Sequence, residues 1–316
     1  MSVFEISSII TCKDKLKMNK NVKIAKKLVR LAKDLVALDE EGDGSGFQVF
    51  HDMESFGVKQ NIADKSGEYK NFTGTIDLTE TSNGYTKGQV SNATFTISKD
   101  GKIEWYDGTW ENGVFGAKDI YDAIWHDGIW KDGTFDTGTW KDGTWKNGTF
   151  TSSHGKYYSL WKNGIWENGT FKGVFKGGVW RNGTFVEGYF RGGTWKDGTW
   201  KNGIFQGGTW KDGTWENGTW ELGFWENGTW KDGEWNGGGR SLQYSYWVSR
   251  PDCGWKNGTW ENGKWMSGTW ENGTWKNGYW HMGTWEKGTW ENGKWNIGRD
   301  KDGKTHNDSP DKWEKE

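Results

Sequence analysis

The chain has 316 residues, and its 50 Gly and 28 Trp make up about a quarter of it, while Pro occurs only twice. The formal net charge of −2 gives the chain as a whole no bias toward nucleic acid or anionic lipid. The charge is unevenly distributed, because residues 1–33 carry nine Lys/Arg and two acidic residues, or +7, which leaves −9 for the remainder.

Cys12 and Cys253 are the two cysteines, and they lie more than 200 residues apart. This spacing excludes a disulfide framework and favours a reducing compartment. The first residues do not resemble a secretory signal, and no stretch approaches the roughly 18 apolar residues that a membrane span requires. We therefore expect a cytoplasmic protein without a membrane span.

Residues 1–46 predict an N-terminal helical segment that ends in an acidic linker. Within it, residues 20–38 predict an amphipathic helix, because apolar residues recur in steps of four and three. These residues are Ile24, Leu28, Leu31, Leu35 and Leu38. The helix is expected either to cap the repeat or to dock on a protein partner or a second copy of the chain. Its basic residues make binding to an anionic surface a weaker alternative.

Residues 47–102 predict a small β-rich section. Thr73–Thr79 and Ala93–Ser98 both alternate between apolar and polar residues, and Ser82-Asn83-Gly84 between them is a turn signal. We expect this section to seed the repeat that follows it.

Residues 103–298 form a repeat in which a large residue recurs every five residues. The typical unit reads Gly208-Thr209-Trp210-Lys211-Asp212, and 26 of the 35 large positions are Trp. Two interruptions, at 151–160 and 236–254, preserve the phase of the repeat, which predicts loops that leave a continuous scaffold. Residues 299–316 are expected to form a polar tail.

The five-residue period favours a coil of short strands. A helix would need a 3.6-residue rhythm, and a meander of two-residue hairpins would leave an odd number of residues per strand, which conflicts with alternating hydrogen bonds. In a coil, Gly and Trp of each Gly-Thr-Trp point inward, while Thr and Lys/Glu face water. Asn/Asp then occupies the corner, where positive φ is tolerated.

This rhythm of small–x–large–x–x resembles the pentapeptide-repeat proteins. The resemblance implies a four-sided β-solenoid that turns once per 20 residues, with nine to ten coils over a length of roughly 45 Å. The 20-residue spacing between Trp235 and Trp255 fits one such turn. The Gly and Trp content departs from that family, which usually has Ala/Ser and Leu/Phe at these positions. Gly-x-Trp-x-Asn-Gly also resembles MORN repeats, so the alternative fold is an open, single-layer antiparallel sheet; choline-binding repeats are a third, weaker resemblance.

No catalytic, cofactor-binding or metal-binding residues are predicted, and the chain is not expected to be an enzyme. The five histidines at 51, 126, 154, 281 and 306 stand alone, and no nucleotide-binding or nucleophile motif occurs. The sole candidate location for a reaction is the non-repeat stretch Arg240–Cys253.

The sequence favours a mainly β repeat protein that acts as a rigid scaffold or spacer and presents its two loops. The alternative is a binding module whose exposed Trp recognise glycans or another extended ligand. Near-neutral charge argues against a nucleic-acid partner. Leu38-Asp39-Glu40-Glu41 resembles sites cut by prohead proteases of tailed bacteriophages, which would imply a virion component cleaved after Glu40.

Overall fold

The computed structural model describes residues 60–63, 66–79, 81, 85–153, 158–237 and 253–313. Contacts between Cα atoms divide the chain into two units, Met1–Gln60 and Asn61–Glu316, and the second unit contains the repeat. The helix predicted at 20–38 and the motif at 38–41 lie outside the described residues. Within the described part, the helical structure consists of one 3-10 turn, η1 (Pro310–Lys312).

Four strands precede the short strands of the repeat, and the last three of them pair antiparallel. They are β1 (Gln60–Ala63), β2 (Gly67–Asp77), β3 (Lys87–Ile97) and β4 (Ile103–Gly116). β3 pairs with β2 on one side and with β4 on the other, and both pairings shift register at irregularities. Positive φ at Asn71 and Asn92 helps the long strands to bend. β2 and β3 lie within residues 47–102, and β4 pairs onward with the first short strands of the repeat.

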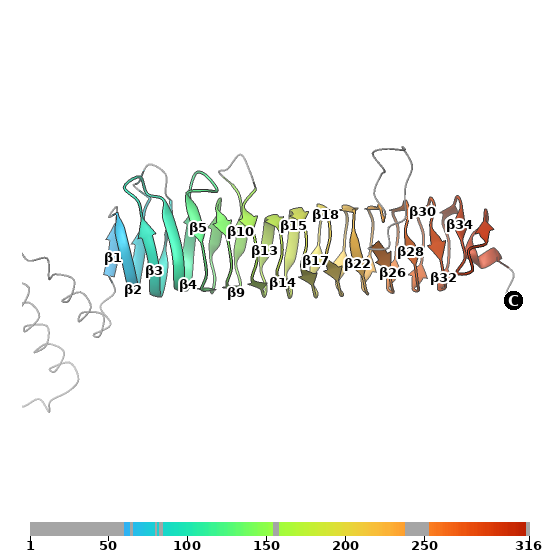
Figure 1. Cartoon of the computed structure of the whole chain (residues 1–316), viewed down its shortest axis with the longest axis horizontal. Coiled ribbons are helices and arrows are strands. Elements are labelled where there is room, and N and C mark those ends of the chain that lie inside the picture. Colours follow the sequence, from blue (N-terminus) through green and yellow to red (C-terminus); the bar gives the residue numbers. More distant parts are fainter. Residues whose placement is uncertain are drawn as a thin grey trace, which may run out of the picture. The chain divides into compact units, whose positions relative to one another are not determined.

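After β4 the strands become very short and pair in parallel. Each strand typically holds the aromatic residue and the residue before it, and it pairs with the strand three places further along. Thr209–Trp210, for example, pairs with Thr194–Trp195 of the preceding coil. Figure 1 shows these strands stacked one after another along the axis of the second unit. The repeat is therefore a β-solenoid, and the alternative open antiparallel sheet does not describe it.

Three consecutive units complete one turn, so the solenoid has three faces, which we call A, B and C in chain order. The expected four-sided turn is wrong, because Trp195 stacks on Trp180 and Trp210, which lie three units before and after it in the sequence. β4 supplies all three faces of the first coil, while β13 (Thr170–Phe175) and β15 (Thr184–Phe190) each turn the corner from face C to face A.

The remaining strands divide among the faces as follows. Face A contains β5 (Ala123–Trp125), β8 (Thr139–Trp140), β11 (Leu160–Trp161), β18 (Ile204–Phe205), β21 (Thr219–Trp220), β24 (Glu234–Trp235), β27 (Lys264–Trp265), β30 (Tyr279–Trp280) and β33 (Lys294–Trp295). Face B contains β6 (Ile129–Trp130), β9 (Thr144–Trp145), β12 (Ile165–Trp166), β14 (Val179–Trp180), β16 (Thr194–Trp195), β19 (Thr209–Trp210), β22 (Gly223–Trp225), β25 (Cys253–Trp255), β28 (Thr269–Trp270), β31 (Thr284–Trp285) and β34 (Gly298–Arg299). Face C contains β7 (Thr134–Asp136), β10 (Thr149–Thr151), β17 (Thr199–Trp200), β20 (Thr214–Trp215), β23 (Thr229–Trp230), β26 (Thr259–Trp260), β29 (Thr274–Trp275) and β32 (Thr289–Trp290). β35 (Thr305–His306) pairs antiparallel with β34 at the end of the solenoid.

The interior consists of three columns of stacked aromatic rings. Along a column, neighbouring rings are nearly parallel, as for Trp215 and Trp230 with centroids 4.6 Å apart. Within a coil, rings of different faces meet edge to face, as for Trp215 and Trp220 at 5.9 Å and 65°. The repeat rings are buried from Trp105 to Trp290, and Trp295 is half-buried. The prediction that Trp points inward is therefore confirmed, and these rings form one continuous core.

Glycine, and not the expected Asn/Asp, adopts positive φ at the corners. Gly208 has φ +107, and a Cβ added there would lie 2.4 Å from the carbonyl oxygen of Gly193 in the preceding coil. At Gly213 the indole Nε1 of Trp195 lies 3.3 Å from the same imaginary atom. These glycines thus leave room for the backbone of the preceding coil, and Gly213 also leaves room for an indole. Asp212 Oδ1 accepts a hydrogen bond from the Gly213 N–H.

The interruptions insert residues without disturbing the stacking. Face B continues directly from Trp225 to Trp255, so the second break adds one coil's length of chain to an ordinary coil. Residues 154–157 and 238–252 of the two loops lie outside the described residues. The sequence did not reveal a third insertion, residues 117–122. The spacing from Trp105 to Trp125 is 20 residues, so the five-residue rhythm continues through it. Ile120 lies in this insertion and not in a ring column, because Trp105 stacks directly on Trp125.

Face A holds rings from Trp105 to Trp295, joined by eleven pairing steps. At about 4.8 Å per step this column is about 53 Å long. The solenoid is therefore longer than the expected length of roughly 45 Å, because each coil uses fewer residues.

Candidate functional site

The outer surface of the solenoid is built from the residues on either side of each ring. Side chains alternate along a strand, so the residues before and after a buried ring both point outward. On face C the residue before the ring is Thr in each coil from Thr134 to Thr289, and most of these threonines are half-buried. The surface therefore consists of columns of like positions, one coil apart.

On faces B and C, charged residues after the ring pair between coils. Lys211 lies 3.0 Å from Glu226, and Lys231 lies 3.8 Å from Glu216. Glu167 lies within 3.3 Å of both Lys146 and Arg181. These side chains are substantially exposed, so each pair contributes about 0.2–1 kcal/mol. This arrangement fits the expectation that Lys and Glu face water.

The described histidines lie apart from one another. His126 Nε2 lies 3.0 Å from Glu104, and His306 Nε2 lies 2.8 Å from Asp300. His281 contacts the Tyr279 hydroxyl at 3.2 Å. His51 and His154 lie outside the described residues. In the part of the chain that the structure describes, no group of three or more His, Cys, Asp and Glu could hold a metal ion.

The stretch Arg240–Cys253, named as a candidate location for a reaction, can be followed only at Cys253. This residue begins β25 and is 3% exposed. The remaining residues of the stretch lie outside the described residues.

A buried polar cluster that the sequence analysis missed lies at the foot of the loop 151–160. Asp136 is 5% exposed, accepts a hydrogen bond from the Ser153 backbone N–H at 2.6 Å and also bonds the Ser153 hydroxyl. The Tyr85 hydroxyl donates to the Asp136 carbonyl at 2.9 Å, and burial raises the pKa of Tyr85. Asp136 and Thr137 replace the usual Lys/Glu and Asn/Asp after the ring, which was the available signal. The cluster anchors the base of the loop to the coil beneath it.

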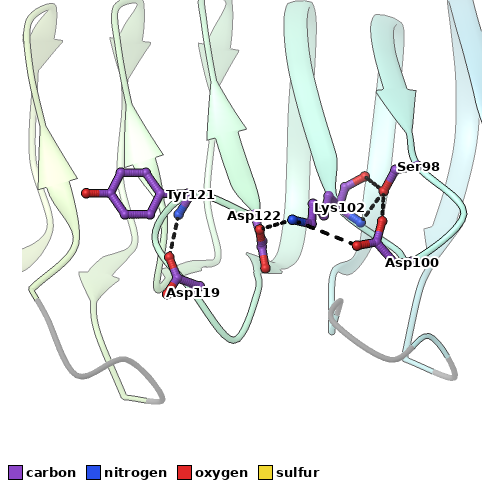
Figure 2. A network of polar contacts seen from close by, with 6 residues as sticks. All are labelled: Ser98, Asp100, Lys102, Asp119, Tyr121 and Asp122. Carbon is purple, nitrogen blue, oxygen red and sulfur yellow. Dashed lines mark hydrogen bonds and ion pairs between the residues drawn. The ribbon is translucent and has the colours of Figure 1, made fainter.

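A second polar network, in Figure 2, joins the β3–β4 turn to the insertion 117–122. Lys102 Nζ lies 2.9 Å from Asp122 Oδ1 and 3.8 Å from Asp100 Oδ2, and the hydrogen bond to Asp122 raises the pKa of Lys102. The Tyr121 backbone N–H donates to Asp119 Oδ1 at 3.0 Å, while the Tyr121 ring points away from Lys102 and is 71% exposed. The contacts of Lys102 with Asp100 and Asp122 hold the turn and the insertion together, which gives the network a structural role.

Comparisons with known proteins leave the chain without a match among family models, curated proteins or solved structures. Within the described residues, no helix has the length and apolar content to cross a membrane.

Proposed function

We propose that this chain is a non-catalytic scaffold or spacer that holds its surface columns and loops at fixed positions along a rigid β-solenoid. The observation that carries the proposal is the unbroken stacking of rings across every insertion. Trp140 stacks on Trp161 across the loop 151–160, and Trp225 stacks on Trp255 across the loop 236–254, both at 4.7 Å. A scaffold requires this continuity, because loops can then vary without moving the coils on either side.

Burial of the Trp columns favours the scaffold over the alternative binding module. A Trp that stacks on a sugar must present a ring face to solvent, whereas the rings of Trp105 to Trp290 are covered by their neighbours. Trp295 and Trp313 are half-buried, and Trp247 in the loop 236–254 lies outside the described residues. These three are the candidates for such a contact.

Tryptophan fluorescence of the full chain tests the proposal. We expect blue-shifted emission that resists acrylamide quenching and does not change when an oligosaccharide is added. Deletion of residues 206–220, which form one coil, should preserve this emission and shorten the solenoid by about 4.8 Å, as measured by small-angle scattering. Water-like emission that shifts with oligosaccharide would reject the scaffold in favour of the glycan-binding alternative.

Two finer assignments remain part of this proposal. The five-residue unit supports a relationship to pentapeptide-repeat proteins in rhythm, with three units per turn in this chain. The motif Leu38-Asp39-Glu40-Glu41 supports a virion component that is cleaved after Glu40. Mass spectrometry of particle-derived protein should then find an N-terminus at Glu41, and an uncleaved chain would argue against this origin.

A further inference from the structure

Face A differs from face C over the coils from Trp161 to Phe205, and face B shares the difference in two of these coils through Ile165 and Val179. The residue before the ring is apolar in four consecutive coils, which we call the apolar row: Leu160, Val174, Tyr189 and Ile204. All four side chains are half-buried. The corresponding position on face C is occupied by Thr in the same coils, so a solenoid of this kind does not require apolar residues there.

The residue after the ring on face A is basic in four consecutive coils, which we call the basic stripe: Lys141, Lys162, Lys176 and Arg191. Backbone hydrogen bonds place them in one column, because each donates its N–H to the ring residue of the coil before. In the described part of the chain, the structure records no carboxylate within ion-pair distance of these four residues. Arg191 lies 5.6 Å from the centre of the Tyr189 ring, and Lys141 Nζ lies 3.4 Å from His126 Nδ1.

The corner of face A that follows the ring lacks a side chain in three coils, whereas other corners carry Asn or Asp. Gly177, Gly192 and Gly207 occupy this position in three consecutive coils, each followed by the usual positive-φ glycine. None of the three adopts positive φ, and a Cβ added to any of them would meet a backbone oxygen at 3.2–3.3 Å. Asp142 and Asn163 occupy the same corner in the two preceding coils, so a side chain fits there with a small adjustment of the backbone. Lys176 and Arg191 of the basic stripe therefore lie beside corners that carry no carboxylate.

These three features describe a surface that is incomplete in the free protein. Like charges one coil apart, at about 4.8 Å, repel one another, and an adjacent apolar row gains stability only when it is covered. An anionic partner with apolar side chains would satisfy both columns. A nucleic acid would satisfy the basic stripe but would place phosphates near the apolar row, so a protein partner fits better.

We propose that face A between Lys141 and Gln206 docks an acidic amphipathic helix of a partner protein, parallel to the solenoid axis. One turn of a helix rises about 5.4 Å, close to the spacing of one coil, so the two would drift by about 1.8 Å over three coils. Alternate residues of an extended strand are about 6.6 Å apart and would drift by about 5 Å over the same distance. Long Lys and Arg side chains absorb the smaller mismatch. The inference rests on the proposed scaffold role, because it requires the columns to be held in register.

The experiment uses the full chain and a dye-labelled synthetic helical peptide with a length of about five helical turns. The peptide carries Leu at positions 4, 8, 11 and 15 and Glu on one flank of this apolar stripe, and a scrambled peptide of the same composition is the control. Fluorescence anisotropy should show binding of the first peptide that weakens as salt is raised, and weaker binding of the scrambled peptide.

Two charge-reversed variants of the protein separate the basic stripe from general charge. Lys162→Glu/Lys176→Glu should weaken peptide binding by about tenfold or more. Lys196→Glu/Lys201→Glu, on faces B and C, makes the same change in net charge and should alter binding by less than about twofold. Val174→Asn, in the apolar row, should also weaken binding while leaving the basic stripe intact.

Several results would overturn the inference. They are equal binding of both peptides, equal effects of the two charge-reversed variants, or tighter and stripe-dependent binding of a single-stranded DNA oligonucleotide or of phosphatidylserine vesicles. Circular dichroism and small-angle scattering on every variant distinguish the two proposals. Loss of the solenoid would count against the scaffold, whereas an intact solenoid without peptide binding counts against the docking surface alone.

Discussion

Face C and face A of the solenoid share one interior and differ in what they present to solvent. On face C, Thr precedes the ring in coil after coil, and Glu216 and Lys231 pair between neighbouring coils. On face A, the apolar row replaces Thr, and the basic stripe has no recorded acidic partner among the described residues. Both faces nevertheless stack their rings in the same way. The comparison shows that the stacked rings of the interior determine the fold, while the outward-facing residues can differ between faces without changing it.

The largest expected effect tests whether the ring columns of faces A and C contribute equally to the free energy of unfolding. Trp215→Ala on face C and Trp220→Ala on face A should each lower the free energy of unfolding by about 3–5 kcal/mol. Each substitution leaves a cavity and removes the stacking contacts of the ring with its two neighbours in the column. Urea unfolding followed by circular dichroism measures both losses. A much smaller loss on face A would show that the two interiors are not equivalent.

A smaller effect compares two adjacent corner glycines, Gly208 with positive φ and Gly207 without it. Gly208→Ala should cost about 1–3 kcal/mol, because φ is +107 and the new Cβ would lie 2.4 Å from the Gly193 carbonyl oxygen. Gly207→Ala, the matched control in the bare corner that follows Gln206, should cost less than about 0.5 kcal/mol.

Thermal unfolding of the two glycine variants supplies the measurement. Equal losses would mean that Gly207 is required by the backbone. The bare corner of face A would then have a structural explanation, and one support of the docking surface would be removed.

The smallest effect concerns a paired charge. A side-chain hydrogen bond from Lys172, 3.0 Å away, lowers the pKa of Glu187. Because the folded-state pKa is depressed, the pair stabilises the protein above the unfolded-state pKa, and this contribution disappears as pH falls through the folded-state pKa. Glu187→Gln should therefore cost about 0.3 kcal/mol at neutral pH and nothing near pH 2, since both side chains are substantially exposed.

Urea midpoints at the two pH values measure the effect of Glu187→Gln. The same loss at both would contradict an electrostatic origin. Arg191→Gln on face A, where no acidic partner is recorded among the described residues, is the matched control and should show no such pH dependence.

Much of the local structure could be predicted from one unit of sequence. Gly-Thr-Trp-Lys-Asp specifies a short strand, an inward ring and a corner, and the structure bears out all three. The unit does not specify how sharply each corner turns. That angle depends on how many rings fill a cross-section, and three indoles meeting edge to face at about 70° close the interior. The sequence of a unit is the same whether three or four units make a turn.

The error in turn length also hid the surface of face A. Lys162, Lys176 and Arg191 follow one another at the spacing of three units, so they share a column only when a coil contains three units. Counted in turns of four units, they fall on different faces. The insertion 117–122 was hidden for a related reason, since one additional unit's length leaves the rhythm unchanged and Ile120 takes the place of a ring in the count.

The length of a coil also has a consequence for heredity. Duplication or loss of fifteen codons adds or removes one whole coil and leaves every downstream residue on its face. A five-codon change that adds or removes a regular strand and corner instead turns everything beyond it by one face, so that the apolar row and the basic stripe would be divided between faces. Residues 117–122 avoid this because they leave the coil as an insertion and Trp105 stacks on Trp125. Replication slippage by fifteen codons should therefore be tolerated, whereas slippage by five codons should disrupt the surface. If selection maintains this surface, related sequences should differ within it by whole coils and not by single five-residue units.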